Sequence, residues 1–241
     1  MKYTKYVFVI LLSLVIMIIC GVNALAMETG FSTEEYHEDT VDKDTFIKNV
    51  NISMLTEEPH RNAIECFDVN ENGEIAIGCG EYERKTVCIY TSDGDFKYGY
   101  SFECSGSFGI ELNGDILNIY LVRSDAAISV DSTGEVKSVL EILDTTENRR
   151  YWNYFVRSTK RTIGDKEYTI KNDVGFLNIL ILESSYSQLV ITDKNGEETI
   201  IYDVNSAQLL RMTVELIATL AFVGFVVISV IRYCIRVKRG G

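Results

Sequence analysis

The sequence predicts an all-β domain held between two hydrophobic terminal segments. The 241 residues include 14 Tyr and 11 Phe but a single Pro, a composition rich in strand-forming residues and unlike that of a disordered linker. Apolar stretches near both ends have the lengths of membrane-inserting segments. The roughly 180 residues between them are enough to bury one sizeable core.

Residues 1–26 have the layout of a secretory signal peptide. Lys2 and Lys5 precede an apolar run over residues 6–20, and Ala24-Leu25-Ala26 is a small-residue cleavage pattern. Because the apolar run is long for a signal peptide, an uncleaved N-terminal anchor is the alternative. In both interpretations the residues after this segment are exported across the membrane.

The second apolar segment predicts a transmembrane helix over residues 209–232. Its central 20 residues, 212–231, carry a single charge, Glu215, and are long enough to cross about 30 Å of hydrocarbon. A basic tail over residues 233–241 follows. Positive charge flanking a span marks the cytoplasmic side, so we expect a single C-terminal pass through the cell membrane, a cytoplasmic C-terminus and an external β domain. The flanking charges are Arg232, Arg236, Lys238 and Arg239.

The domain between the apolar segments is strongly acidic. Residues 27–208 contain 16 basic against 34 acidic side chains, a net charge of −18. Such a surface repels the phosphates of nucleic acids and favours cationic partners or simple solubility. We therefore expect no nucleic acid partner.

Three stretches of 18 residues share one pattern. Residues 85–102, 125–142 and 187–204 each contain a β-rich run, a turn with Gly at the tenth position and a second β-rich run with alternating apolar residues. Gly supplies the positive φ that tight turns need, so each stretch predicts a β-hairpin. The turn glycines are Gly94, Gly134 and Gly196.

A further hairpin is expected before each of these, with turns at Gly73, Gly114 and Gly175. The chain then divides into four-stranded units over residues 63–103, 104–143 and 162–204. The first two units repeat with a period of about 40 residues, which is typical of β-propeller blades.

Over residues 64–204 the pattern resembles the blade repeats of six-bladed, NHL-like β-propellers. The resemblance implies a propeller-like repeat domain over residues 63–207, built from about three four-stranded antiparallel units. Closed propellers have about four to eight blades. The ring is therefore incomplete, or two copies complete each other as a homodimer, or the units pack as open sheets.

Two segments lie outside the repeats. Residues 27–62 are expected to form an acidic, loosely structured spacer, in which residues 45–55 could add one edge strand. Residues 144–161 form an insertion that gathers basic and aromatic side chains, the types that dominate binding hot spots. The insertion either covers an open sheet edge or forms a partner-binding or membrane-facing loop. The candidate patch is Arg149, Arg150, Tyr151, Trp152, Tyr154 and Arg157.

Neither a metal nor another cofactor is predicted. Residues 68–73 resemble the opening of a calcium loop, but the closing acid is missing, so a hairpin turn with Asx hydrogen bonds is the better interpretation. The exported region holds four cysteines. If a disulfide forms, we expect Cys79 with Cys88, because a turn centred on Glu83 and Arg84 would place them opposite each other on adjacent strands.

Motifs for catalysis are lacking. His37 and His60 are the only histidines and both lie outside the repeats, and no common hydrolase or nucleotide-binding motif occurs. We therefore expect a non-catalytic module that binds or scaffolds another protein or a surface polymer. The alternative is a surface glycan hydrolase or lyase that uses Asp and Glu, which requires two carboxylates about 5–10 Å apart in a cleft.

Overall fold

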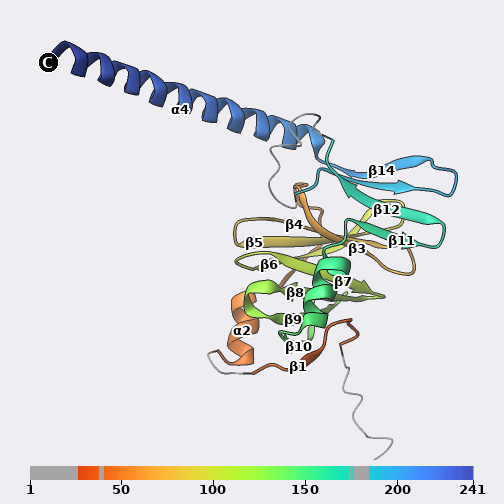
Figure 1. Ribbon diagram of the computed structural model, residues 1–241. Coiled ribbons are helices and arrows are strands. Elements are labelled where there is room, and N and C mark those ends of the chain that lie inside the picture. The colour runs from red at the N-terminus through yellow and green to blue at the C-terminus, as the bar shows by residue number, and fades with distance from the viewer. Residues whose placement is uncertain (1–26, 38–40, 174, 176–184, 241) are drawn as a thin grey trace, which may run out of the picture.

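The computed structural model describes residues 27–37, 41–173, 175 and 185–240. The predicted signal or anchor segment, residues 1–26, lies outside the described residues. The described secondary structure consists of short strands, three short helical segments, one π-helix turn and one long C-terminal helix (Figure 1). Its elements are β1 (Thr33–Glu35), α2 (Lys43–Val50), β2 (Ser53–Leu55), β3 (Ile64–Val69), β4 (Ile75–Glu81), β5 (Arg84–Tyr90), β6 (Phe96–Glu103), β7 (Phe108–Asn113), β8 (Ile116–Leu121), η1 (Val122–Ser124), β9 (Ala126–Asp131), β10 (Val136–Ile142), α3 (Thr146–Tyr151), η2 (Trp152–Val156), β11 (Lys160–Ile163), β12 (Lys166–Lys171), β13 (Gln188–Thr192), β14 (Glu198–Asp203) and α4 (Asn205–Gly240).

The strands form three antiparallel sheets. Each sheet contains four strands that follow one another along the chain, with the orders β3 to β6, β7 to β10 and β11 to β14. Two of the sheets gain a short fifth strand from the N-terminal region, β2 beside β6 and β1 beside β10. The expectation of a β-rich body with three antiparallel sheets is confirmed, whereas a propeller arrangement stays a prediction.

The third sheet begins earlier than expected. Its first hairpin turns at Gly164 and Asp165, because Ile163 pairs with Lys166, and Gly164 has the positive φ of 58° that such a two-residue turn needs. The expected turn at Gly175 was wrong, since this residue follows β12 instead of separating the first two strands. The end of the predicted insertion therefore belongs to β11.

The sheet β3 to β6 lies in the middle of a stack of three (Figure 1). One apolar cluster joins it to the sheet β7 to β10, with Val87 and Tyr100 packed among residues such as Ile119. A second cluster joins its other face to the sheet β11 to β14, through Phe67 and Tyr168. The third unit thus packs on the first, whereas consecutive blades around a ring would place it beside the second.

Residues 27–62, which were expected to form a loosely structured spacer, contain the short strands β1 and β2 and the helix α2. Helix α2 begins at the cap Asp42, whose carboxylate accepts a hydrogen bond from the Thr45 N–H at 3.0 Å, and its residue Val50 is buried in the core. Thr45 therefore belongs to a helix, and the expected edge strand shortens to β2. Phe46 and Ile47 of α2 also pack against this core cluster, which fixes the polar segment on the sheets.

The outer face of the sheet β7 to β10 is covered by the chain itself. Phe31 packs edge-on against Tyr120 with ring centroids 4.7 Å apart, and Val156 of η2 joins the same buried cluster. The N-terminal residues and the insertion therefore seal this end of the stack.

Helix α4 extends away from the stacked sheets (Figure 1). Within residues 205–230 the most apolar stretch of 18 residues has a mean hydropathy of 2.3, and none of this stretch is buried against the domain. At about 1.5 Å per residue, the 26 residues from Asn205 to Val230 are longer than the roughly 30 Å of a bilayer core. It is the one helix within the described residues that is long and apolar enough to span a membrane, which fits membrane anchoring.

Candidate functional site

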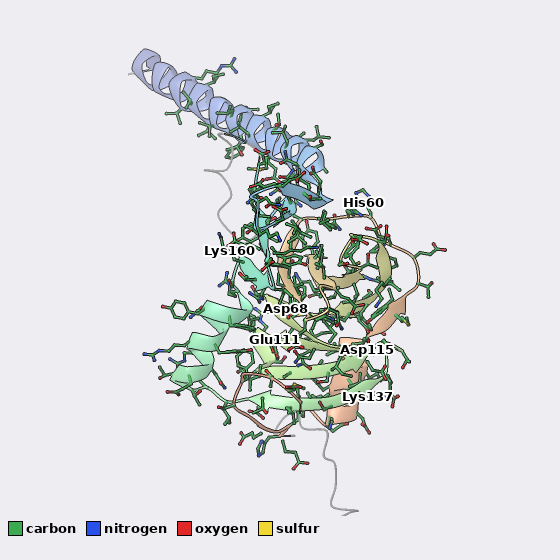
Figure 2. All side chains as sticks on the ribbon, turned by 90° about the vertical axis from the view of Figure 1, so that its right-hand side faces the viewer. His60, Asp68, Glu111, Asp115, Lys137 and Lys160 are labelled. Atoms are coloured by element: carbon green, nitrogen blue, oxygen red, sulfur yellow. The ribbon has the colours of Figure 1, made fainter. Side chains whose placement is uncertain are left out.

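A cavity of about 920 Å³ lies where the first strands of all three sheets meet the insertion. We call it the inner cavity. Figure 2 shows Lys160 of β11, Asp68 of β3 and Glu111 of β7 following one another across this region. The charged and aromatic residues of its lining are Glu28, Asp68, Glu71, Glu111, Tyr151, Tyr154, Phe155, Lys160 and Arg161.

The strands β3, β7 and β11 are each the outermost strand of their sheet. One row of main-chain N–H and C=O groups on such a strand has no partner within its own sheet. Asp68 satisfies one of these groups, because its carboxylate accepts the N–H of Leu112 on β7 at 2.8 Å. A buried carboxylate of one sheet thereby fixes the edge of the next.

Asp68 also forms a buried ion pair with Arg161. The Arg161 Nε donates to Asp68 Oδ1 at 2.6 Å, and both side chains are 8% exposed. The guanidinium lies over the rings of Phe155 and Phe67, at 4.7 and 5.5 Å from their centroids, and Nη1 donates to the Lys160 carbonyl. Nη2 is buried and has no hydrogen-bond partner among the described residues, so one strong donor of this cavity-lining residue has no acceptor.

Glu111 is the second buried carboxylate of the cavity. It is 3% exposed and accepts hydrogen bonds from the hydroxyls of Tyr120 and Tyr151. Burial raises the pKa of Glu111, although these two hydrogen bonds act in the opposite direction. The pKa values of both tyrosines are also raised, first by burial and then by the neighbouring carboxylate.

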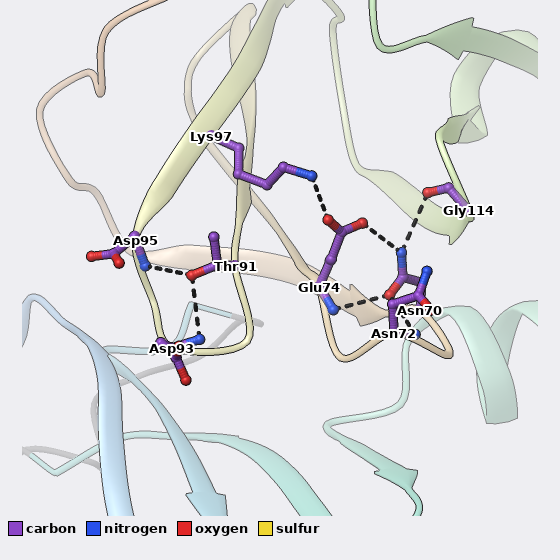
Figure 3. A network of polar contacts seen from close by, with 8 residues as sticks. All are labelled: Asn70, Asn72, Glu74, Thr91, Asp93, Asp95, Lys97 and Gly114. Carbon is purple, nitrogen blue, oxygen red and sulfur yellow. Dashed lines mark hydrogen bonds and ion pairs between the residues drawn. The ribbon is translucent and has the colours of Figure 1, made fainter.

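Hairpin turns form the rim of the cavity. Asn70 Oδ1 accepts the N–H groups of Asn72 and Glu74 at 3.0 and 2.9 Å, and Gly73 has a φ of 78°. Asn70 Nδ2 also reaches the Gly114 carbonyl of the second sheet at 3.3 Å (Figure 3). The sequence that resembled a calcium loop is thus a hairpin turn that links two sheets.

The same turn occurs at three further hairpins. Thr91 accepts the N–H groups of Asp93 and Asp95 through its hydroxyl (Figure 3). Asp131 and Asp193 use a carboxylate oxygen in the same way. The fourth turn residue is Gly in every case, with φ values of 90°, 87° and 81°. One local sequence rule therefore recurs in all three sheets.

The insertion is held against β7 by close packing. A Cβ atom on Gly109 would lie 2.3 Å from Val156 Cγ1 and 2.8 Å from the Trp152 ring, so only glycine permits this approach. Asn148 of α3 is buried and donates to the carbonyls of Ser32 and Leu143. The segment between β10 and β11 thus has a defined position.

The predicted basic and aromatic patch is divided by this arrangement. Tyr151 points to Glu111, and Trp152 packs on Gly109. Arg149 forms a bidentate ion pair with Asp144 on the surface, and Arg150 and Arg157 are exposed. Of the six predicted residues, Tyr151 and Tyr154 line the inner cavity, and Tyr154 is 82% exposed.

The sequence did not predict that Asp68, Glu111 and Arg161 form part of a site. Asp68 and Glu111 occupy matching positions, Asp68-Val69-Asn70 and Glu111-Leu112-Asn113, in the first strands of their units. A charge inside an otherwise apolar strand was the available signal, because such a residue is buried only with a partner. The partner Arg161 is 93 residues away from Asp68 and could not be paired with it from local spacing.

The expected disulfide rested on a wrong register. The β4–β5 hairpin turns at Tyr82 and Glu83, which places Cys79 opposite Thr86 and Cys88 opposite Ile77. The four cysteines of the β domain are buried free thiols. Burial raises the pKa of Cys79 and Cys88 to about 12 in each case, so these thiols act as small apolar core residues.

One surface cluster has the composition of a metal site. Glu34, His37 and Glu141 offer ligand atoms that all lie within 4.8 Å of one another. His37 Nδ1 lies 3.7 Å from Glu34 and 3.5 Å from Glu141, contacts that also fasten the chain around β1 to β10. Ion pairing at this sheet edge accounts for the cluster.

Comparison of the chain with protein-family models, with curated proteins and with solved structures found no match. The description of the protein therefore rests on its structure alone: a β domain of three antiparallel sheets joined to an apolar C-terminal helix.

Proposed function

We propose that the chain is a membrane-anchored, extracytoplasmic binding or scaffolding module without catalytic activity, and that the inner cavity is its ligand site. The observation that carries this proposal is the convergence of three strand edges on one cavity with an exposed aromatic wall. Ligand sites in proteins are concave, have volumes of about 300–1,000 Å³ and combine apolar walls with a few placed polar groups. The inner cavity has each of these properties.

The proposed orientation rests on charge. The apolar part of α4 is followed by Arg232 and a basic C-terminal sequence, which favours a cytoplasmic C-terminus. The acidic β domain then lies outside the cell membrane. Protease treatment of intact cells should remove the β domain and leave a C-terminal epitope protected, and the reverse pattern would overturn this orientation.

Binding is favoured over catalysis by the state of the buried charges. The Asp68 oxygens accept hydrogen bonds from Arg161 and from the Leu112 N–H. The Glu111 oxygens accept the hydroxyls of two tyrosines. A catalytic acid or base must reach the proton that it transfers, whereas these oxygens are directed at the protein.

A surface glycan hydrolase or lyase is the second candidate. The observation in its favour is that two buried carboxylates line one cavity, and burial raises the pKa of Glu111 while Asp68 lies in an ion pair. A buried carboxyl group with a raised pKa that shares a cavity with a second carboxylate is the pattern of a glycosidase acid and its partner. Release of reducing sugar from envelope glycans, lost in Glu111→Gln, would establish this activity.

The binding proposal is tested with a cavity-filling substitution. Thr162 is exposed and lines the inner cavity, whereas Thr199 is exposed on the same sheet outside it. Full-length wild type, Thr162→Trp and Thr199→Trp are immobilised in lipid nanodiscs and exposed to solubilised envelope of the producing cell. The proposal expects a captured species that Thr199→Trp retains and Thr162→Trp loses. Capture that is the same for all three proteins would contradict it.

Self-association is a separate proposal. A homodimer could complete the ring that three blade-like units leave open. Sedimentation of the full chain in detergent at several concentrations measures this directly. A monomer at all concentrations would remove ring completion and leave the inner cavity as a site within one chain.

A further inference from the structure

We propose that the ligand of the inner cavity is an extended, basic segment of another polypeptide. The inference rests on the proposed binding function and names the ligand class. Three features of the cavity favour this class: an excess of acidic side chains, sheet edges beside a guanidinium N–H₂ group that has no acceptor among the described residues, and exposed aromatic rings.

The charged side chains of the cavity favour a positively charged ligand. Its lining contains four acidic side chains and two basic ones. Arg161 is neutralised by Asp68, and Lys160 donates to Glu167 outside the cavity at 2.8 Å. Glu28 and Glu71 are exposed and have no side-chain partner among the described residues. Within a domain of net charge −18, these two carboxylates favour a positively charged ligand and disfavour an anion.

The Arg161 N–H₂ group and the strand edges at the cavity favour a polypeptide ligand. Arg161 is 8% exposed and keeps one N–H₂ group without an acceptor among the described residues. A cationic side chain cannot supply that acceptor, whereas a peptide carbonyl can. The strands β3, β7 and β11 each present a sheet edge at the cavity, and edge strands bind extended peptides through main-chain hydrogen bonds.

The aromatic wall supplies a place for the basic side chain. Tyr154 is 82% exposed and Phe155 is 42% exposed, and both line the cavity. A Lys or Arg side chain over such a ring gains cation–π attraction. Phe155 already holds the Arg161 guanidinium at 4.7 Å, so Tyr154 is the ring left for the ligand.

The test uses full-length protein in nanodiscs of uncharged lipid and fluorescein-labelled octapeptides, with fluorescence anisotropy at 0.15 M salt as the readout. The peptides alternate Gly with Lys, Ser or Glu. Glu28→Gln/Glu71→Gln removes two cavity carboxylates. Glu57→Gln/Glu83→Gln changes the net charge equally at exposed sites outside the cavity, and is the matched control.

The proposal expects binding of the Gly-Lys peptide only. The cavity double variant should weaken this binding by roughly five- to tenfold, as expected for two exposed ion pairs, and Tyr154→Ala by about two- to fivefold. The control double variant should bind within twofold of wild type.

Three results would overturn the proposal: no binding of the Gly-Lys peptide, equal weakening by both double variants, or equal binding of the Gly-Ser peptide. A neutral oligosaccharide whose binding is lost in Thr162→Trp would refute the ligand class and leave the binding function standing. If Thr162→Trp weakens the binding of none of the labelled peptides, of no oligosaccharide and of no envelope component, the proposed binding function is refuted as well.

Discussion

The buried ion pair between Asp68 and Arg161 makes a quantitative prediction about the assembly of the three sheets. The pair joins β3 to β11, and Asp68 also holds the edge of β7. Arg161→Met would leave the Asp68 carboxylate in the interior with a single remaining donor. Unit charges about 4 Å apart attract by about 4 kcal/mol at an effective dielectric constant of about 20, and removal of one partner of a buried pair typically costs about 3–5 kcal/mol. Since both side chains are 8% exposed, solvent screening reduces this value little.

The double variant makes the prediction specific to the pair. Asp68→Asn keeps an acceptor for the Leu112 N–H but removes the charge that balances Arg161. Asp68→Asn/Arg161→Met should therefore lose less free energy of unfolding than the two single variants together, with a coupling of about 2 kcal/mol. Apolar or neutral replacement of both partners is commonly tolerated where loss of one is not.

Trp152 provides the assay, because it is the only tryptophan and packs on Gly109. Urea unfolding of the full chain in detergent, followed by tryptophan fluorescence, gives the free energies of the four proteins. The single variants should also lower the melting temperature by roughly 6–20 °C. A loss below about 1 kcal/mol in Arg161→Met, or strict additivity in the double variant, would refute the structural role given to the pair.

Three further predictions concern single sites. Gly109→Val should push η2 from β7 and shift Trp152 emission to the red, since a Cβ there would lie 2.3 Å from Val156 Cγ1; unchanged emission would contradict the packing. Burial raises the pKa of Glu111, so the folded protein binds this proton more tightly than the unfolded chain, and the free energy of unfolding should fall as the pH rises above about 4.5. Glu111→Gln should flatten that fall, and an identical pH profile would exclude Glu111 as its source. Burial raises the pKa of Cys79 and Cys88 to about 12, so peptide mapping should find both unlabelled by maleimide at pH 8 until the protein unfolds; rapid labelling of the folded protein would contradict their burial.

The hairpin turns were predictable from the sequence because their chemistry is local. In the turn of Asn70, one side-chain oxygen, two main-chain N–H groups and a glycine with positive φ lie within five residues. The same spacing around Asp131 and Asp193 gives the same turn. The strands that flank these turns, and the three antiparallel sheets, follow from that pattern.

The order of the sheets was not predictable in the same way. It depends on contacts such as that between Phe67 and Tyr168, which are about 100 residues apart in the chain. The resemblance to blade repeats left the order of the three units open, and the apolar faces pack the third unit on the first. The hairpin at Gly164 was missed because β11 is short and its basic residues resembled a surface loop.

For the candidate site, too, features that depend on neighbouring residues were predictable from the sequence, and contacts between distant residues were not. The insertion was recognised from its composition, and Tyr151 and Tyr154 of its patch line the inner cavity. Asp68, Glu111 and Arg161 were missed because their burial is created by sheets that meet only after folding. A polar residue in an apolar strand is ambiguous until its partner is known.

The most direct test of the inner cavity as a ligand site is photo-crosslinking in intact cells. Benzoylphenylalanine replaces Tyr154, which is 82% exposed at the cavity, or Tyr82, which is 91% exposed at the β4–β5 turn outside it. The account predicts a discrete adduct from position 154 that disappears when Thr162→Trp fills the cavity, and no such adduct from position 82. Equal adducts from both positions, or an adduct at 154 that persists in Thr162→Trp, would contradict it.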